Sequence, residues 1–351
     1  MKSDFAVGSF VLAPSDFHSG LLPGKVLAII DRKQIAYIRY TGCDPRQDNW
    51  VLLPLLKIDL STNLVVKKRK GDYISDERND FFVRNIETIQ FGDYIIKCWY
   101  YSPYPPSFID NMHMYICDTC LLYFCSQEAF RNHSHVHGFQ RPPGIEIYRC
   151  GNVSLFEVHG AKNKLFCQCL SLLSRFFLKD VAVFYDISSF NYYVLCECDE
   201  NGAHIVAFFS RDNKWDGNHI LACIMVLPPF QNRGYGTLLI SIAYEMAKRR
   251  GIIGTPEKPL SDMGKIAFSS YWKNEIIRSL QHFPMSVKTL DDIALTTWIS
   301  KPDLRKTLTE MNLITSKRGP ILNANQILKM KSKGLLTPKP SKFAPEQLFW
   351  T

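Results

Sequence analysis

The stretch Leu221-Ala-Cys-Ile-Met-Val-Leu-Pro-Pro-Phe-Gln-Asn-Arg-Gly-Tyr-Gly236 decides the fold of this chain. Its apolar first half is typical of a β-strand, and two consecutive prolines end it because proline cannot donate to a strand ladder. A glycine-containing turn follows, and a helical pattern starts near Thr237. This order predicts a strand, a tight turn and a helix whose first backbone N–H groups can hold a pyrophosphate.

Other segments of the chain support this interpretation and point to one family. They are Trp99-Tyr-Tyr-Ser-Pro103, Pro142-Pro-Gly-Ile-Glu-Ile-Tyr-Arg149, Gly254-Thr-Pro-Glu-Lys-Pro-Leu-Ser-Asp262 and Ser269-Ser-Tyr-Trp272. Together with the first stretch, they make the chain resemble the MYST-type histone acetyltransferases from about residue 86 to the C-terminus. The resemblance implies an acetyl-CoA-dependent lysine acetyltransferase with a mixed α/β, GNAT-like core.

The resemblance also predicts a domain organisation. Residues 1–58 resemble a chromo-barrel (tudor-knot) domain, a small β-barrel, and residues 59–85 are a basic linker. Residues 86–351 form the acetyltransferase domain. Within that domain we expect a zinc finger over 115–140, an acetyl-CoA-binding core over 145–272 and a helical, winged-helix-like region over 273–351.

Composition restricts the class of protein. No run of about 18 apolar residues is present, so we expect no transmembrane helix and no membrane partner. Eleven cysteines without a secretory signal favour reduced thiols or metal ligation over disulfides. The net charge of +9 favours contact with nucleosomal DNA, whereas a basic histone tail would require acidic residues grouped around the substrate groove.

Four residues have the types and spacing of a structural zinc site: Cys117, Cys120, His133 and His137. A fully closed set of four ligands predicts a structural ion with no open position for chemistry. His135 competes for the ligand role, but on a helix it would face away from both neighbouring histidines. The alternative is a pair of free thiols beside surface histidines. MYST proteins usually carry a cysteine where this chain has His137.

Acetyl transfer to a lysine needs a base, because the ammonium has a pKa of about 10.4. By resemblance, Glu257 is that base, and we expect partial burial to raise its pKa. The neighbouring Lys258 would lower the pKa if the two side chains met. Cys223 has two functional interpretations, an acetylated nucleophile or a residue that lines the site during direct attack. Its apolar surroundings favour direct attack, and a buried structural cysteine stays an alternative.

The cofactor site is predicted from the strand, the turn and two serines. Arg233 would add positive charge to the pyrophosphate site, and Gly234 and Gly236 would let the backbone approach it closely. The full set predicted for acetyl-CoA is Ile224, Met225, Val226, Gln231, Asn232, Arg233, Gly234, Tyr235, Gly236, Thr237, Ser261 and Ser270.

Outside the expected catalytic centre, three features allow two interpretations each. Tyr37, Tyr40 and Trp50 form either part of a methyl-lysine cage or, as we favour, the core of a very small barrel. The run Lys67-Lys-Arg-Lys70 and the lysines at 329, 331 and 333 are nucleic-acid contacts or solvated surface, and the first is also a candidate nuclear localisation signal. MYST enzymes usually carry an acetylated lysine where this chain has Arg175, so we hypothesise that activation through that modification is absent.

The sequence therefore predicts a nuclear enzyme that acetylates the tails of nucleosomal histones, histone H4 above all. The resemblance implies further subunits in a multiprotein complex, with DNA or RNA contact through the basic segments. Two alternatives stay open: a chromatin reader or scaffold without catalysis, and an acetyltransferase for lysines of non-histone proteins.

Overall fold

The computed structural model describes most of the chain outside 59–85. The described residues are 5–15, 20–31, 34–43, 47–58, 86–105, 112–136, 140–178, 187–214, 217–282, 289–314, 327, 329, 332–334, 337–338 and 340–350. They fall into two compact units. The first comprises Met1–Ile89, Lys97–Met114 and Arg175–Lys179, and the second comprises Gln90–Ile96, Tyr115–Ser174 and Asp180–Thr351. The predicted basic run 67–70 lies outside the described residues.

The first unit contains a five-stranded antiparallel sheet in the order β4-β3-β2-β1-β5. The strands are β1 (Phe10–Pro14), β2 (Leu21–Ile30), β3 (Ile35–Tyr40), β4 (Asn49–Leu52) and β5 (Lys57–Ile58). Apolar side chains alternate along β1, so Val11 and Ala13 face the core while their neighbours face outward. Tyr40 belongs to this core and its hydroxyl donates to the Pro14 carbonyl, which agrees with the core interpretation favoured for it.

The other two predicted cage residues of this sheet lie opposite each other. Tyr37 on β3 is buried and pairs in register with half-buried Trp50 on β4. Their ring centroids are 5.2 Å apart with an interplanar angle of 50°, so the two rings pack against each other.

A four-stranded sheet in the order β7-β6-β8-β9 leads into the finger. Its strands are β6 (Thr88–Phe91), β7 (Tyr94–Lys97), β8 (His113–Ile116) and β9 (Tyr123–Phe124), and helix α1 (Gln127–Val136) follows. Phe124 on β9 contacts both Phe130 and His133 of α1, with ring centroids 6.0 Å and 5.0 Å away. This small aromatic cluster holds the helix beside the β8–β9 turn.

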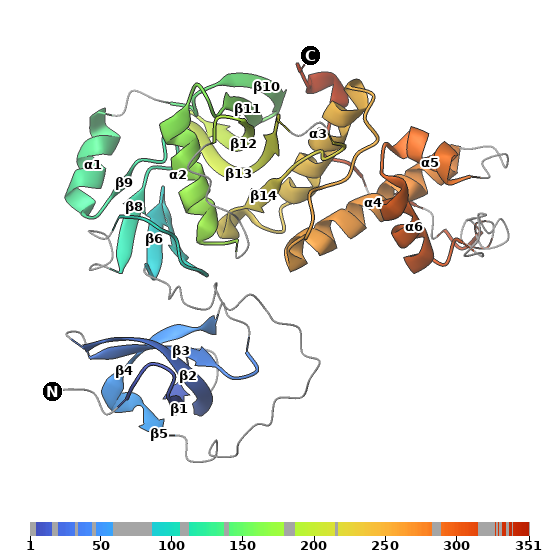
Figure 1. Ribbon diagram of the computed structural model, residues 1–351. Coiled ribbons are helices and arrows are strands. Elements are labelled where there is room, and N and C mark those ends of the chain that lie inside the picture. Colours follow the sequence, from blue (N-terminus) through green and yellow to red (C-terminus); the bar gives the residue numbers. More distant parts are fainter. Residues whose placement is uncertain are drawn as a thin grey trace. The chain divides into compact units, whose positions relative to one another are not determined.

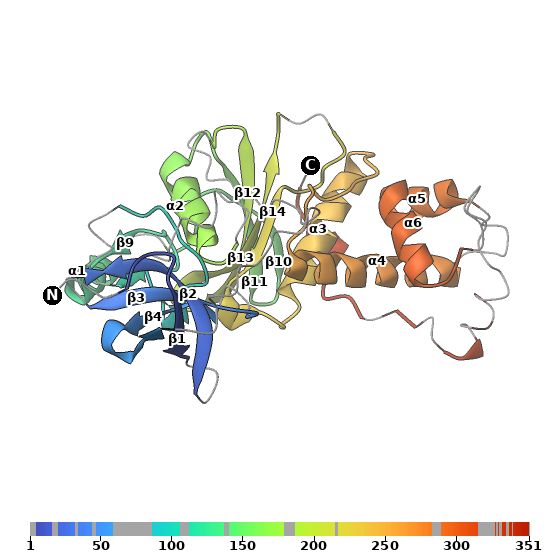
Figure 2. The same cartoon turned by 60° about the horizontal axis from the view of Figure 1, so that its bottom comes forward.

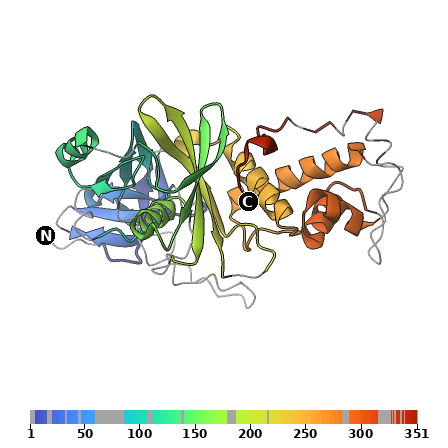
Figure 3. The same cartoon turned by 90° about the horizontal axis from the view of Figure 1, so that it is seen from above.

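The core of the second unit is a five-stranded antiparallel meander, β10-β11-β12-β13-β14 (Figure 1). The strands are β10 (Ile145–Cys150), β11 (Val153–His159), β12 (Phe190–Asp199), β13 (Gly202–Asp212) and β14 (Cys223–Val226). Helices α2 (Lys164–Arg175) and α3 (Tyr235–Arg249) lie on opposite faces of this sheet (Figures 2 and 3). Arg175 is therefore the last residue of α2, where it is half-buried.

Helix α3 confirms the apolar stripe that its sequence predicts. Leu238, Leu239, Ile242, Ala243 and Met246 are all buried. The helix begins two residues before the expected start, because Gly234 adopts a left-handed conformation and serves as its N-cap.

Three further helices extend the second unit: α4 (Asp262–His282), α5 (Leu290–Thr297) and α6 (Lys301–Glu310). The Trp272 indole N–H of α4 donates to the Tyr244 hydroxyl of α3 over 2.8 Å. The segment Ser300-Lys-Pro-Asp303 is typical of a helix start, and Ser300 caps α6. Leu304 and Leu308 are buried on this helix, and Met311 at its end is half-buried. The segment 325–333 has the pattern of another short helix, but most of it lies outside the described residues.

The end of the described chain returns to the core. The Arg249 guanidinium of α3 donates to the carbonyls of Pro345, Leu348 and Trp350 at 2.8 to 3.0 Å. The Phe349 N–H donates to the Ile147 carbonyl of β10 over 2.7 Å. Across the part of the chain that the structure describes, no helix has both the length and the apolar character to cross a membrane.

Candidate active site and metal centre

Strand β14 forms one edge of the core sheet. It pairs antiparallel with β13 from Ser210↔Cys223 to Ala207↔Val226. An edge strand leaves one row of its backbone groups unpaired by the sheet, and these groups are available to a substrate. The predicted contact residues Ile224 and Val226 are half-buried here, whereas Met225 faces the core.

The turn after β14 has the geometry of a helix-terminal anion site. Pro228–Phe230 forms a single 3-10 turn, and the Gln231 amide donates to the Val226 carbonyl over 3.1 Å. Asn232 and Gly234 then adopt positive φ angles of 61° and 89°. The first N–H groups of α3 have no carbonyl partner within the helix, and the helix dipole makes this end electropositive.

Charged side chains surround the turn in an arrangement that local sequence does not reveal. Arg233 lies 3.6 Å from Glu197 of β12 and 5.2 Å from the Phe230 ring centroid, and the Tyr235 hydroxyl donates to the same glutamate. Lys342, over a hundred residues further along the chain, donates its Nζ to the Arg233 carbonyl over 2.7 Å. Sequence reasoning missed Lys342, since nothing in its local pattern indicates where it lies.

Glu257 and Cys223 lie close enough to interact electrostatically. The Glu257 N–H donates to the Leu221 carbonyl over 3.0 Å, which attaches its loop to the segment that leads into β14. Burial, together with the negative charge of Glu257, raises the pKa of the Cys223 thiol to about 12. The structure thus brings together the two residues predicted for chemistry, and it keeps the thiol protonated at neutral pH.

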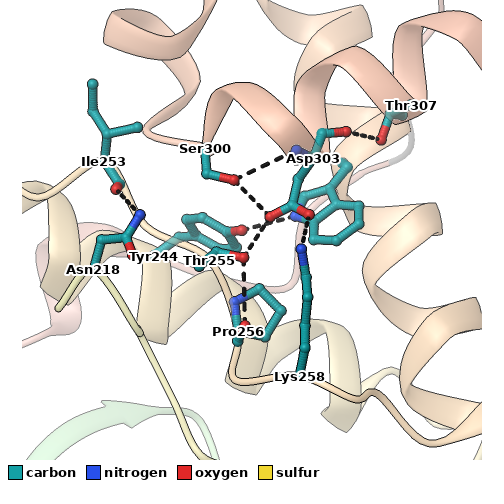
Figure 4. A network of polar contacts seen from close by, with 10 residues as sticks. Asn218, Tyr244, Ile253, Thr255, Pro256, Lys258, Ser300, Asp303 and Thr307 are labelled. Atoms are coloured by element: carbon teal, nitrogen blue, oxygen red, sulfur yellow. Dashed lines mark hydrogen bonds and ion pairs between the residues drawn. The ribbon is translucent and has the colours of Figure 1, made fainter. Parts of the chain in front are cut away.

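The surroundings of Glu257 differ from the sequence expectation in one respect. Its side chain is exposed, so the expected partial burial is wrong. Gly254 and Pro256 of the same loop are buried, so the exposure begins at Glu257 itself. Lys258 donates its Nζ to Asp303 Oδ1 over 2.7 Å, and its charge is therefore engaged by α6 (Figure 4).

The two predicted serines lie at the start and in the middle of α4. Ser261 precedes the helix, and its Oγ accepts the Gly264 N–H over 3.1 Å, so it acts as the N-cap. A serine hydroxyl that accepts one bond can still donate another. Ser270 lies further along α4, and its side chain is exposed. Thr237, in the first turn of α3, is exposed too.

The finger brings three of the four predicted metal ligands together. The donor atoms of Cys117, Cys120 and His133 all lie within 4.8 Å of one another. Cys120 Sγ is 3.4 Å from His133 Nε2, and the hydrogen bond from Cys120 lowers the pKa of the Cys117 thiol to about 5. Two thiols and an imidazole at this separation fit a tetrahedral Zn²⁺ ion. His137 lies outside the described residues.

Comparison with known proteins agrees with this geometry. The profile of the MOZ/SAS family matches residues 141–343, and that of the MYST family zinc finger domain matches residues 83–136. The chain belongs to the MYST family. As a MYST protein it is an acetyltransferase that uses acetyl-CoA and carries a structural zinc ion.

Curated MYST relatives cover most of the chain. The histone acetyltransferase of the MYST family 2 from Arabidopsis thaliana is 35% identical over 81% of this chain and 70% of its own length. Histone acetyltransferase esa1 from Emericella nidulans is 38% identical over 76% of this chain and 54% of its own. Histone acetyltransferase MOF from Drosophila melanogaster is 38% identical over 68% of this chain and 29% of its own.

Proposed function

We propose that this MYST protein transfers the acetyl group of acetyl-CoA to lysine ε-amino groups of nucleosomal histones, with the tail of histone H4 as the main acceptor. The names of the curated relatives support histones as the substrate class. The exposure of Glu257 supports a protein-borne acceptor, because a lysine on an extended tail can reach a carboxylate that lies at the surface.

In the proposed reaction Glu257 is the general base. It removes a proton from the lysine ammonium, the neutral amine attacks the thioester carbon, and the C–S bond breaks. The departing sulfur takes up the second proton, which the attacking nitrogen loses as the amide forms, and leaves as the free thiol of coenzyme A. The observation that supports this assignment is the Glu257 N–H bond to the Leu221 carbonyl, which attaches its loop to the segment that leads into β14, where the Glu257 charge contributes to the raised pKa of Cys223. A positioned base contributes typically about 10²–10⁴ in rate.

We assign Cys223 to the wall of the site, with no covalent intermediate. A thiol whose pKa is raised to about 12 is almost entirely protonated at neutral pH, and the thiol form is a weak nucleophile. Direct attack by the lysine amine avoids the energy needed to form a thiolate beside the Glu257 charge. Backbone N–H groups at the exposed edge of β14 are suited to polarise the thioester carbonyl.

We assign acetyl-CoA to the edge of β14 and the turn that follows. The strand residues at 224–226 would line the acetyl and pantetheine portion, and the turn at 231–237 would hold the pyrophosphate. Lys342 adds a positive charge that the sequence did not predict, and it lies on the backbone of the same turn. Ser261 and Ser270 complete the proposed contacts from α4.

We further assign the structural zinc to Cys117, Cys120, His133 and His137. The proximity of the first three donors supports this set. The protein would act on chromatin in the nucleus, within a complex of further subunits, and the relatives named as histone acetyltransferases support that setting. The lysines at 329, 331 and 333 are candidates for contact with nucleosomal DNA or with RNA, and Lys331 lies outside the described residues.

An acetyl-CoA assay on nucleosomes tests the proposal, with wild type, Glu257→Gln and Cys223→Ala compared under the same conditions. We expect Glu257→Gln to lower kcat by at least a hundredfold, and Cys223→Ala to stay within about threefold of wild type. Equal loss in both variants would favour a covalent route through Cys223. An inactive wild type that binds nucleosomes would favour the reader or scaffold, and acetylation of free proteins alone would favour a non-histone acceptor.

A further inference from the structure

Asp303 is a buried carboxylate at the start of α6. It is 2% exposed and occupies the third position of the helix, where its N–H is directed at the Ser300 Oγ of the cap. Burying a carboxylate is costly unless other groups compensate its charge. Capping the helix does not require a buried carboxylate at this position, because the Ser300 side chain already accepts the free N–H at this helix end.

Both carboxylate oxygens of Asp303 accept hydrogen bonds from the loop that carries Glu257 (Figure 4). Oδ2 accepts the Thr255 hydroxyl over 2.6 Å and the Ser300 hydroxyl over 2.8 Å. Oδ1 accepts the Lys258 ammonium over 2.7 Å. Thr255 and Lys258 stand on either side of Glu257 in the sequence, so one carboxylate holds the loop on both sides of the proposed base.

Backbone bonds hold the same loop between two segments. On one side the Thr255 N–H donates to Asn218 and the Glu257 N–H donates to Leu221, both over about 3 Å. On the other side the Gly254 carbonyl accepts the Ser300 N–H over 2.9 Å. The backbone is therefore attached both to the segment that leads into β14 and to the cap of α6, and the Asp303 contacts add side-chain bonds to that attachment.

The Lys258 contact also has an electrostatic consequence. A cation that pairs with a carboxylate base lowers the pKa of that base and weakens it. Lys258 follows Glu257 directly. Other titratable groups close to this loop are Cys223 on β14, His219, whose backbone pairs with Thr255, Asp303 on α6 and Tyr244 on α3, which interacts electrostatically with Asp303. By pairing with Lys258, Asp303 keeps the ammonium away from Glu257.

We propose that Asp303 is a positioning residue for Glu257: it holds the loop at Thr255 and Lys258 and keeps the Lys258 ammonium from pairing with the base. The proposal rests on the proposed role of Glu257 and extends it to a residue that does not touch substrate. Buried hydrogen bonds that fix a reacting group matter because a displacement of about 1 Å can cost roughly a hundredfold in rate.

The test compares Asp303→Asn with Thr307→Val. Thr307 is buried in the same helix and donates to the backbone carbonyl of Asp303, so its substitution weakens α6 without touching the loop. We expect Asp303→Asn to lower kcat at least tenfold with the KM for acetyl-CoA within twofold of wild type. The acid limb of kcat/KM should move to lower pH, and Asp303→Asn combined with Lys258→Met should return it. Thr307→Val should keep kcat within twofold at a comparable loss of melting temperature.

Equal kcat in Asp303→Asn and Thr307→Val would overturn the proposal. If Asp303→Asn does not fold, Thr255→Val and Thr255→Ser replace it: we expect the first to lower kcat at least threefold and the second, which keeps the hydroxyl, to restore it. If Thr255→Val and Thr255→Ser both keep the kcat of wild type, the proposal is also overturned. The Glu257→Gln variant separates the role of Glu257 as base from the role of Asp303 as positioning residue. If Glu257→Gln is active, the base assignment itself is wrong. If Glu257→Gln is inactive but Asp303→Asn has normal activity, only the inference about Asp303 is wrong.

Discussion

His204 Nδ1 on β13 lies 2.7 Å from Asp118 Oδ2, in the turn that also contains Cys117 and Cys120. Its Nε2 lies 3.1 Å from Asp199 Oδ1, and the Asp118 carbonyl accepts the Ile205 N–H over 3.0 Å. One imidazole thus connects the metal-binding turn to the core sheet. Hydrogen bonds to Asp118, and then to Asp199, raise the pKa of His204 to about 9.

This pair predicts a stability contribution that depends on pH. Because folding raises the pKa of His204 above its ordinary value of 6.5, the stabilisation is complete below pH 6.5 and is lost as the pH rises through about 9. We expect His204→Gln to destabilise the zinc-loaded protein by about 1 kcal/mol at pH 6.5, and by much less at pH 10. Melting curves across this range measure the difference.

The control for that experiment is His159→Gln. His159 pairs with the neutral amide of Asn191, its Nδ1 being 3.0 Å from Oδ1. Its substitution removes a hydrogen bond to an uncharged partner, so the resulting loss of stability involves no ion pair. A His204→Gln difference that stays constant from pH 6.5 to pH 10 would contradict the charge-based account.

The metal assignment predicts different effects for two neighbouring histidines. Removing a residue that binds the zinc ion should weaken zinc binding more than removing a residue that only hydrogen-bonds to such a ligand. Loss of the second kind typically lowers metal affinity about 10–100-fold. We therefore expect His137→Ala to weaken zinc binding at least tenfold and His135→Ala to leave it within twofold. Competition with a chromophoric chelator, with zinc content by mass spectrometry, measures both. Equal weakening by the two variants would mean that the fourth ligand is misassigned.

The high pKa of the Cys223 thiol predicts slow alkylation. At pH 8 a thiol with a pKa of about 12 has almost no thiolate, and the thiolate is the reactive form. We expect iodoacetamide to label Cys223 at least ten times more slowly than the exposed Cys150. Peptide mass spectrometry over a time course gives both rates. Labelling of Cys223 as fast as Cys150 would show a thiolate and would reopen the covalent route.

The turn before α3 predicts a selective effect of glycine substitution. Gly234 has a φ of 89°, and a Cβ there would lie 3.3 Å from the Lys342 side chain. We expect Gly234→Ala to cost about 1 kcal/mol of stability and to raise the KM for acetyl-CoA severalfold. Gly251 also has a positive φ, of 71°, but nothing lies within 4 Å of a Cβ there, so Gly251→Ala should cost stability and leave that KM unchanged.

Local patterns predicted the parts of this fold that depend on local chemistry. The strand that ends at two prolines, the glycine-containing turn and the Cys–Cys–His spacing are each encoded within a short segment, and the structure forms each of them. The apolar stripe of α3 and the cap of α6 follow from helical periodicity and from the serine hydroxyl in the same way.

The contacts that complete the site join distant segments, and no local pattern predicts them. Lys342 reaches Arg233, Asp303 reaches Lys258, and His204 reaches Asp118 only because the folded chain places them side by side. The expected burial of Glu257 fails for the same reason. Pro256 before it is buried while Glu257 itself is exposed, and only the fold determines which residues of the loop other segments cover.

Arg249 acts as a latch for the last residues of the chain. Its guanidinium donates to three carbonyls between positions 345 and 350. Lys342 lies just before these residues in the sequence and donates to the Arg233 carbonyl in the turn before α3. A truncation after residue 340 would therefore remove both Lys342 and the carbonyls that accept hydrogen bonds from Arg249. Enzyme preparations that have lost this short tail to proteolysis should bind coenzyme poorly even though every residue of the predicted active site is intact.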